Sequence, residues 1–201
     1  MGKWVRYLAI CVVFFSTFLL VGCKRSGVGP VGVLGLGDET AEAGKVVYDA
    51  NQDLTKIKIL YEQNEGKREE LKSAMEKNDV ERTKKIADEV VTLINNGDAF
   101  GRSAIDKLQK AQEMEVNAEY REYLRLKEES LKLELDAFEN YRQAARSLRD
   151  NFDPKNGALR EKVKIEFKAR NEKYRSTMEK ARAKSKEANE VAKAALSNSK
   201  Q

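Results

Sequence analysis

From residue 38 to the end of the chain, apolar side chains recur every three or four residues, and the only proline is Pro154. This spacing gathers apolar side chains on one face of an α-helix. Strands need alternating apolar and polar residues between turn signals, and such runs are missing from this part of the sequence. The pattern therefore predicts an all-α protein whose helices bury their apolar faces against one another.

Four segments carry the helical pattern, over residues 40–77, 80–114, 118–149 and 158–197. Asn78-Asp79 and Asn117 are expected to cap the helices that follow them, and Asp153–Gly157 is a strong turn signal. Helices of roughly 32 to 40 residues are about 50 to 60 Å long. Because the connections are short, neighbouring helices should be antiparallel. The sequence predicts an elongated up-down-up-down four-helix bundle, with coiled-coil-like packing, over residues 38–201.

The second segment leaves one alternative open. Asn95-Asn96-Gly97-Asp98 has the composition of a turn and would end the helix early. Gly97 and Gly101, however, fall in phase with the apolar stripe, which favours a continuous helix with a close contact or a kink there. The competing arrangement has three helices, with the second segment broken.

The first 22 residues have the layout of a secretory signal peptide. Lys3 and Arg6 form a short basic start, and the 15 residues from Tyr7 to Val21 carry no charge. A membrane-spanning helix needs about 20 apolar residues, so this run is short for a span. The alternative is a slightly short transmembrane anchor.

The end of this run, Leu20-Val21-Gly22-Cys23, resembles the lipobox of bacterial lipoproteins. In that family the cysteine thiol receives a diacylglycerol, a peptidase cuts before the cysteine, and the new amino group is acylated, commonly with palmitate. The resemblance implies cleavage between Gly22 and Cys23 and a lipid anchor on Cys23. Several acyl chains together hold a protein stably at a membrane without a spanning helix. The expected location is extracytoplasmic, at the cell membrane or outer membrane.

Residues 23–37 are expected to form a tether between the lipid and the bundle. The stretch Ser26–Gly37 contains five glycines and Pro30, a composition that cannot hold a helix. Its valines and leucines are unusual for a linker, and the alternative is that they dip into the membrane interface or cover part of the bundle. Cys11 lies in the segment that would be removed, so the mature chain has no cysteine pair and no disulfide framework.

The sequence offers little chemistry to an enzyme. It contains no histidine, which removes most acid–base and nucleophilic schemes and nearly all zinc and haem sites. It has no glycine-rich phosphate loop with a lysine and no calcium loop. The neighbouring carboxylates Glu69-Glu70, and Glu128-Glu129 with Glu134, are interpreted as solvated helix faces. We expect no catalysis, no metal and no cofactor apart from the lipid on Cys23.

The charge of the chain is uneven. Residues 38–154 carry 20 basic and 27 acidic side chains, whereas residues 155–201 carry 14 basic and 6 acidic ones. The last helix is therefore cationic beside acidic neighbours, which serves either internal charge complementarity or an external anionic partner. The residues concerned are Lys162, Lys164, Lys168, Arg170, Lys173, Arg175, Lys180, Arg182, Lys184 and Lys186.

The overall plan loosely resembles small helical lipoproteins described as cell-wall-binding, in its layout only. We expect a non-catalytic bundle that binds a cell-envelope partner, which is a wall polymer, an anionic lipid or a protein. Nucleic acid is not expected, because an exported protein does not meet it and motifs with interleaved aromatic residues are missing. The alternative function is a periplasmic holdase or assembly accessory protein that grips client proteins.

Overall fold

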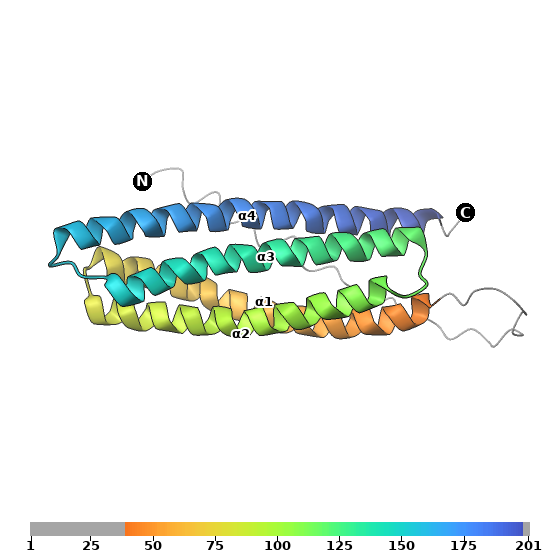
Figure 1. Cartoon of the computed structure of the whole chain (residues 1–201), viewed down its shortest axis with the longest axis horizontal. Helices are drawn as coiled ribbons and strands as arrows, with labels where there is room; N and C mark the ends of the chain where they lie inside the picture. Colours follow the sequence, from red (N-terminus) through yellow and green to blue (C-terminus); the bar gives the residue numbers. More distant parts are fainter. Residues whose placement is uncertain (1–38, 199–201) are drawn as a thin grey trace, which may run out of the picture. The chain divides into compact units, whose positions relative to one another are not determined.

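The computed structural model describes residues 39–198, which form four α-helices and no strand within that range. They are α1 (Thr40–Glu76), α2 (Val80–Gln112), α3 (Ala118–Asn151) and α4 (Gly157–Asn198), and consecutive helices run antiparallel (Figure 1). The predicted all-α four-helix bundle is confirmed. The expected signal peptide, the lipidation site at Gly22-Cys23 and the expected tether lie outside the described residues.

The connection between α1 and α2 is a tight turn set by two residues. Asn78 has a positive φ of 53°, a left-handed conformation that asparagine tolerates better than most residues. Asp79 then caps α2, because its carboxylate accepts a hydrogen bond from the Arg82 backbone N–H at 3.1 Å. The predicted turn and cap are confirmed.

The other two connections are also set by local side-chain contacts. The Asn117 side chain accepts a hydrogen bond from the Tyr120 backbone N–H at 2.7 Å, as expected for the residue that begins α3. Before α4, the Asn156 side chain accepts a hydrogen bond from the Leu159 backbone N–H at 3.1 Å. Pro154 precedes this cap, where a missing backbone N–H does not interrupt a helix.

Helix α2 is continuous through both glycines, so the three-helix alternative with a broken second segment is wrong. Gly97 and Gly101 are buried. A Cβ atom added to Gly101 would lie 2.4 Å from Cδ2 of Leu135, so α2 and α3 approach closely at this point because Gly101 has no side chain. The predicted close contact is therefore at Gly101.

The core is divided into two clusters along the helices. The first, at the α1–α2 turn end, draws on all four helices and is rich in aromatic rings; its members include Leu71, Val90, Phe138, Tyr141, Leu148, Val163 and Tyr174. The second draws on α1, α2, α3 and the loop before α3, and includes Val47, Ile57, Leu108, Val116, Leu124 and Leu131. Helix α4 contributes no member to the second cluster.

The second half of α4 instead packs mainly on α3 through small residues. Ala181 and Ala188 are fully buried, and the Ser130 hydroxyl donates to the Ala181 carbonyl at 2.9 Å. Extensive interfaces are formed only by helices that are consecutive in the sequence. The seam between α1 and α4 is therefore the loosely packed side of the bundle.

Candidate functional site

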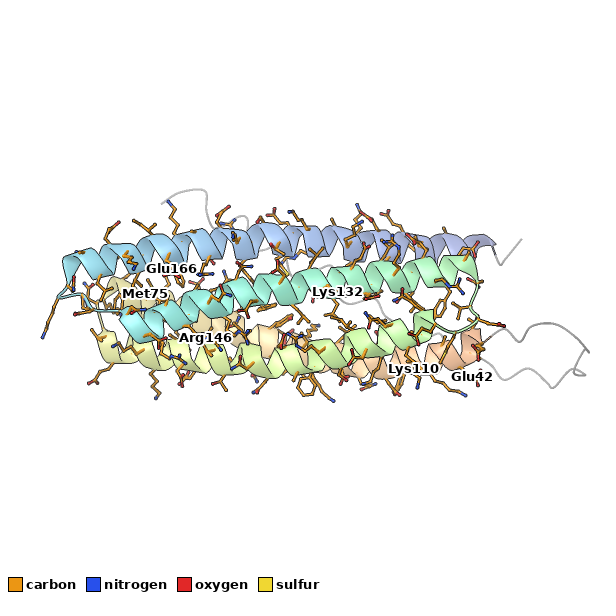
Figure 2. The ribbon with its side chains drawn as sticks, in the orientation of Figure 1. Glu42, Met75, Lys110, Lys132, Arg146 and Glu166 are labelled. Carbon is orange, nitrogen blue, oxygen red and sulfur yellow. The ribbon has the colours of Figure 1, made fainter. Side chains whose placement is uncertain are left out.

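The ten basic residues expected to form an anion-binding face all lie on α4. Eight of them are exposed, and Arg170 and Lys184 are half-buried. From Lys162 to Lys186 they extend over about 36 Å of helix at 1.5 Å per residue. Side chains project from α4 on the sides away from the other helices, with Glu166 labelled as a reference point (Figure 2).

Three of the ten are held by acidic side chains. Arg170 pairs with Glu166 at 3.0 Å and also donates to the Gln143 amide of α3. Lys184 lies 2.8 Å from Glu187 and 3.7 Å from Glu129 of α3. The hydrogen bond from Lys184 to Glu187 raises the pKa of the lysine. These contacts agree with the first interpretation, in which α4 complements its acidic neighbours.

Lys186 is the third, with Glu190 one turn further along α4 at 3.8 Å. The remaining seven make no ion pair with any residue in the described range 39–198, and they are Lys162, Lys164, Lys168, Lys173, Arg175, Lys180 and Arg182. Close ion pairs within the bundle therefore neutralise only a minority of the ten basic residues. Seven exposed cations without a close ion pair lie along one helix.

Helix geometry divides these seven cations into two rows. At 100° per residue, the α1-side row, defined as Lys164, Lys168, Arg175 and Arg182, occupies one flank, and the α3-side row, defined as Lys162, Lys173 and Lys180, occupies the other. Contacts of neighbouring α4 residues show which flank faces which helix. Asn171 accepts a hydrogen bond from Arg68 of α1 at 3.5 Å, whereas Arg170 and Lys184 contact α3. The basic face is therefore two parallel lines of charge.

The expectation that the neighbouring carboxylates are all solvated is wrong for Glu134, which is half-buried and lines a cavity, and for Glu128. The Glu128 side chain is buried, with 8% of its surface exposed, and accepts from Gln109 at 2.7 Å and Gln112 at 2.6 Å. The Lys132 ammonium lies 2.5 Å from the Glu128 carboxylate. Burial alone would raise the pKa of Glu128, but the hydrogen bonds from Lys132 and the two glutamines outweigh it and lower the pKa. Glu128 is thus a structural anchor between α2 and α3.

A second buried charge was not anticipated from the sequence. Asp53 of α1 is 4% exposed and accepts from Lys107 of α2 at 2.5 Å and from Ser103 at 2.8 Å. Burial would raise its pKa, but these bonds and a third from Lys56 lower it to about 2. Every one of these contacts is internal, so the cluster ties α1 to α2 and offers no open position to a ligand.

Arg68 of α1 is used internally as well. Its guanidinium carbon lies 5.1 Å from the ring centre of Tyr141 and 4.8 Å from that of Tyr174. These distances are typical of cation–π contacts, which are stronger where water is excluded. Arg68 therefore joins α1 to the aromatic part of the core.

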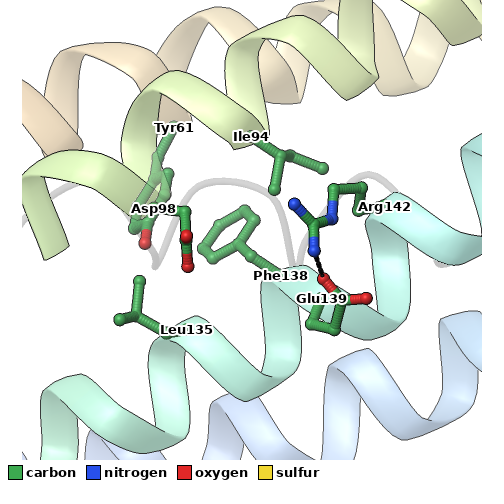
Figure 3. Close-up of a pocket in the computed structure, with 7 residues that line it drawn as sticks. All are labelled: Tyr61, Ile94, Asp98, Leu135, Phe138, Glu139 and Arg142. Carbon is green, nitrogen blue, oxygen red and sulfur yellow. Dashed lines mark ion pairs between the residues drawn. The ribbon is translucent and has the colours of Figure 1, made fainter. Parts of the chain in front are cut away.

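Figure 3 shows a small cavity between α1, α2 and α3, with Tyr61, Asp98 and Leu135 on one side and Arg142 paired with Glu139 on the other. Its volume is about 10 Å³, which is at most the room needed by a single water molecule. The Tyr61 hydroxyl is buried there without a hydrogen-bond partner in the described structure. The cavity is too small to hold a substrate.

Residues 39–198 contain neither a membrane-spanning helix nor a metal-binding group. None of the four helices has a stretch long and apolar enough to cross a membrane. No group of three or more cysteine or acidic side chains in this range is arranged to hold a metal ion. The predicted lipidation residue Cys23 is outside this range.

Comparison with known proteins gave no relative. The chain matches no protein-family model, no curated protein and no solved structure.

Proposed function

We propose that this chain is a membrane-anchored bacterial lipoprotein whose non-catalytic helical bundle binds an anionic partner of the cell envelope through α4. The observation that carries the proposal is the set of seven exposed cations on α4 without an ion pair in the described range. Solvated cations in a line create a positive potential that concentrates anions and steers their approach. The lipobox-like Leu20–Cys23 supports the anchoring half of the proposal.

The two rows favour an extended polyanion over a flat surface. The outward ridge of α4, between the rows, carries Glu172 and Glu179, which are exposed. An anionic membrane lying against this ridge would meet those carboxylates together with the cations. A linear polymer with regularly spaced phosphates or carboxylates contacts one row at a time, which makes a wall polymer the preferred partner within the envelope.

The alternative function, a holdase for client proteins, is supported by three large apolar side chains that face solvent. Tyr48 and Ile59 on α1 are 64% and 52% exposed, and Ile165 on α4 is 61% exposed. Tyr48 and Ile59 are about 16 Å apart along α1 at 1.5 Å per residue, and Ile165 lies on another helix, whereas a client-gripping surface needs a contiguous apolar patch. We therefore rank this function second.

Binding is tested by co-sedimentation of soluble residues 38–201, which include the whole described core, with purified cell-wall sacculi and separately with anionic liposomes. We expect pelleting with sacculi that weakens as salt rises, because exposed charges are screened beyond about 10 Å at 0.1 M salt. The test variant carries glutamine at the four positions of the α1-side row. The matched control carries glutamine at four exposed cations elsewhere: Lys77, Lys85, Lys110 and Arg146.

Loss of pelleting in the test variant but not in the control would support the α4 face. Equal loss of pelleting in both variants would show that binding depends on the net charge of the protein and not on the α4 face. Pelleting with liposomes alone would identify an anionic lipid surface, and not a wall polymer, as the partner. The absence of pelleting with either would refute the proposal. Anchoring is tested separately, because a full chain with Cys23→Ala should lose the lipid mass and the membrane association of the wild type.

A further inference from the structure

A second cavity lies in the seam between α1 and α4, with α3 behind it. Its volume is about 50 Å³, and roughly 10–15 Å³ is enough for one water molecule. Its lining includes Val47 and Leu54 of α1, Lys127, Leu131 and Glu134 of α3, and Ser185 of α4. The cavity exists because α4 adds no apolar residue to the second core cluster at this level, so the seam is left partly unfilled.

Two side chains of opposite charge, Lys127 and Glu134, line this cavity from the same helix. They are seven residues apart on α3, which places them on one face about 10 Å apart along the axis. Both are half-buried. Neither makes an ion pair or a hydrogen bond with any residue of 39–198, and the Lys127 ammonium lies 5.8 Å from the centre of the Tyr123 ring.

The surroundings do not compensate either charge fully. Burial lowers the pKa of Lys127 and raises the pKa of Glu134 to about 7, so both shifts favour the neutral forms. Lys127 and Arg182 of α4 favour the ionised Glu134, but less strongly than burial opposes it. Together with burial, the charge of this carboxylate in turn helps to raise the pKa of Tyr61 of α1 and of Tyr174 of α4. Removing buried charges from water is costly unless they are paired.

We propose that this cavity binds a small zwitterion with a carboxylate and an ammonium joined by methylene groups, such as an ω-amino acid or a chain end of that chemistry. The ligand carboxylate pairs with Lys127 and its ammonium pairs with Glu134. A simple anion would leave Glu134 uncompensated, and a simple cation would leave Lys127 uncompensated. The apolar side chains of Val47, Leu54 and Leu131 suit the methylene groups between the two charges.

Binding should depend on pH in a defined direction. A ligand ammonium beside Glu134 favours the ionised carboxylate, so binding at neutral pH releases a proton from this group. Affinity for the zwitterion should therefore rise between pH 6 and pH 8, across the pKa of about 7. This inference is independent of the basic face of α4 and does not require it.

The test uses the full chain in a non-ionic detergent and isothermal titration calorimetry with β-alanine, γ-aminobutyrate and ε-aminocaproate. Butyrate and butylamine each supply one of the two charges and serve as ligand controls. We expect saturable binding of at least one zwitterion with a Kd of about 1 mM or tighter. Neither control ligand should saturate in that range. The chain length of the zwitterion that binds most tightly should indicate the distance between the Lys127 ammonium and the Glu134 carboxylate.

Two protein variants, Lys127→Met and Glu134→Gln, should each weaken binding at least tenfold. Both replace a half-buried charge with a neutral side chain of similar size, so the bundle should fold at least as stably as the wild type. The exposed pair Lys110→Met and Glu119→Gln is the matched control and should bind like the wild type. Lack of saturation with every zwitterion, equal binding of butyrate, or unchanged binding by both cavity variants would each overturn the inference.

Discussion

The close approach of α2 and α3 at Gly101 makes a substitution there informative. In Gly101→Ala, the new Cβ would lie 2.4 Å from Cδ2, 3.0 Å from Cδ1 and 3.1 Å from Cγ of Leu135. Three atoms of one side chain are involved, so a small rotation of its end does not relieve the contact. Overpacking of this kind costs about 1–3 kcal/mol, whereas alanine gains about 1 kcal/mol over glycine inside a helix. We expect a net loss of about 1 kcal/mol.

Gly66→Ala is the matched control. Gly66 also lies inside a long helix, but a Cβ there has no neighbour within 4 Å, so only the helix-propensity gain of up to about 1 kcal/mol applies. The two variants should therefore differ by about 2 kcal/mol in the free energy of unfolding, with opposite signs relative to wild type. Urea denaturation followed by circular dichroism measures both, provided that the m value is unchanged.

Leu135→Ala supplies a further check on the cause. If the clash with Leu135 is responsible, Gly101→Ala should be neutral or stabilising in the Leu135→Ala background, and the double-mutant cycle should show a coupling of about 1 kcal/mol or more. Equal stabilisation by Gly101→Ala and Gly66→Ala in the wild-type background would refute the close-contact argument.

Three further predictions follow from the buried charges and the caps. Asp53→Asn should remove stability that the wild type has above pH 4 and loses as the pH falls from about 4 to 2, because the folded pKa of about 2 is below the ordinary value of 3.8. Acid titration of unfolding should show a difference of about 2 kcal/mol between the two proteins, and a parallel pH dependence of both would contradict the prediction. Glu134→Gln should have the opposite pH dependence, because the folded pKa of Glu134, about 7, lies above the ordinary value of 4.5. The wild type should lose stability relative to the variant as the pH rises from 4.5 to 7. Urea denaturation at both ends of that range measures this, and a difference in stability that does not change with pH would count against the prediction. Asp79→Ala should cost about 1 kcal/mol by removing the cap on the Arg82 N–H, and Asp79→Asn, which keeps an acceptor, should recover most of that loss in the same assay.

The helices and their ends were predictable from the sequence because they depend on local interactions. Apolar spacing fixes the face that each helix buries, and the side chains of Asp79, Asn117 and Asn156 satisfy backbone groups only two or three residues away. The continuity of α2 was also predictable, because Gly97 and Gly101 keep the phase of its stripe. These features require no knowledge of which helices are neighbours.

The buried charges were not predicted, because they depend on partners from other helices. Glu128 lies in phase with Leu124 and Leu131, but its burial is tolerable only because Gln109 and Gln112 of α2 reach it. A charged residue in phase with an apolar stripe was the available signal for burial. The sequence alone does not identify the partner or the sign of the pKa shift.

The basic character of the last helix was predictable from composition. Which of its cations would form ion pairs was not predictable. Arg170 and Lys184 are distinguished from their neighbours only by their orientation toward α3. Lys127 and Glu134 gave no signal as site residues, since a seven-residue spacing of opposite charges is common on helix surfaces. Their importance comes from the gap that α4 leaves beside them.

The restriction of the large interfaces to consecutive helices has a consequence for how the chain reaches its native state. Each of these interfaces closes through a connection of only a few residues, so little loop entropy is lost before favourable contacts form. Proteins dominated by such local contacts fold quickly. A chain that emerges with its amino terminus first can bury α1 against α2, and then add α3, before α4 is available. The last helix, with its alanine contacts and its row of charges, is then docked onto a three-helix unit already in place.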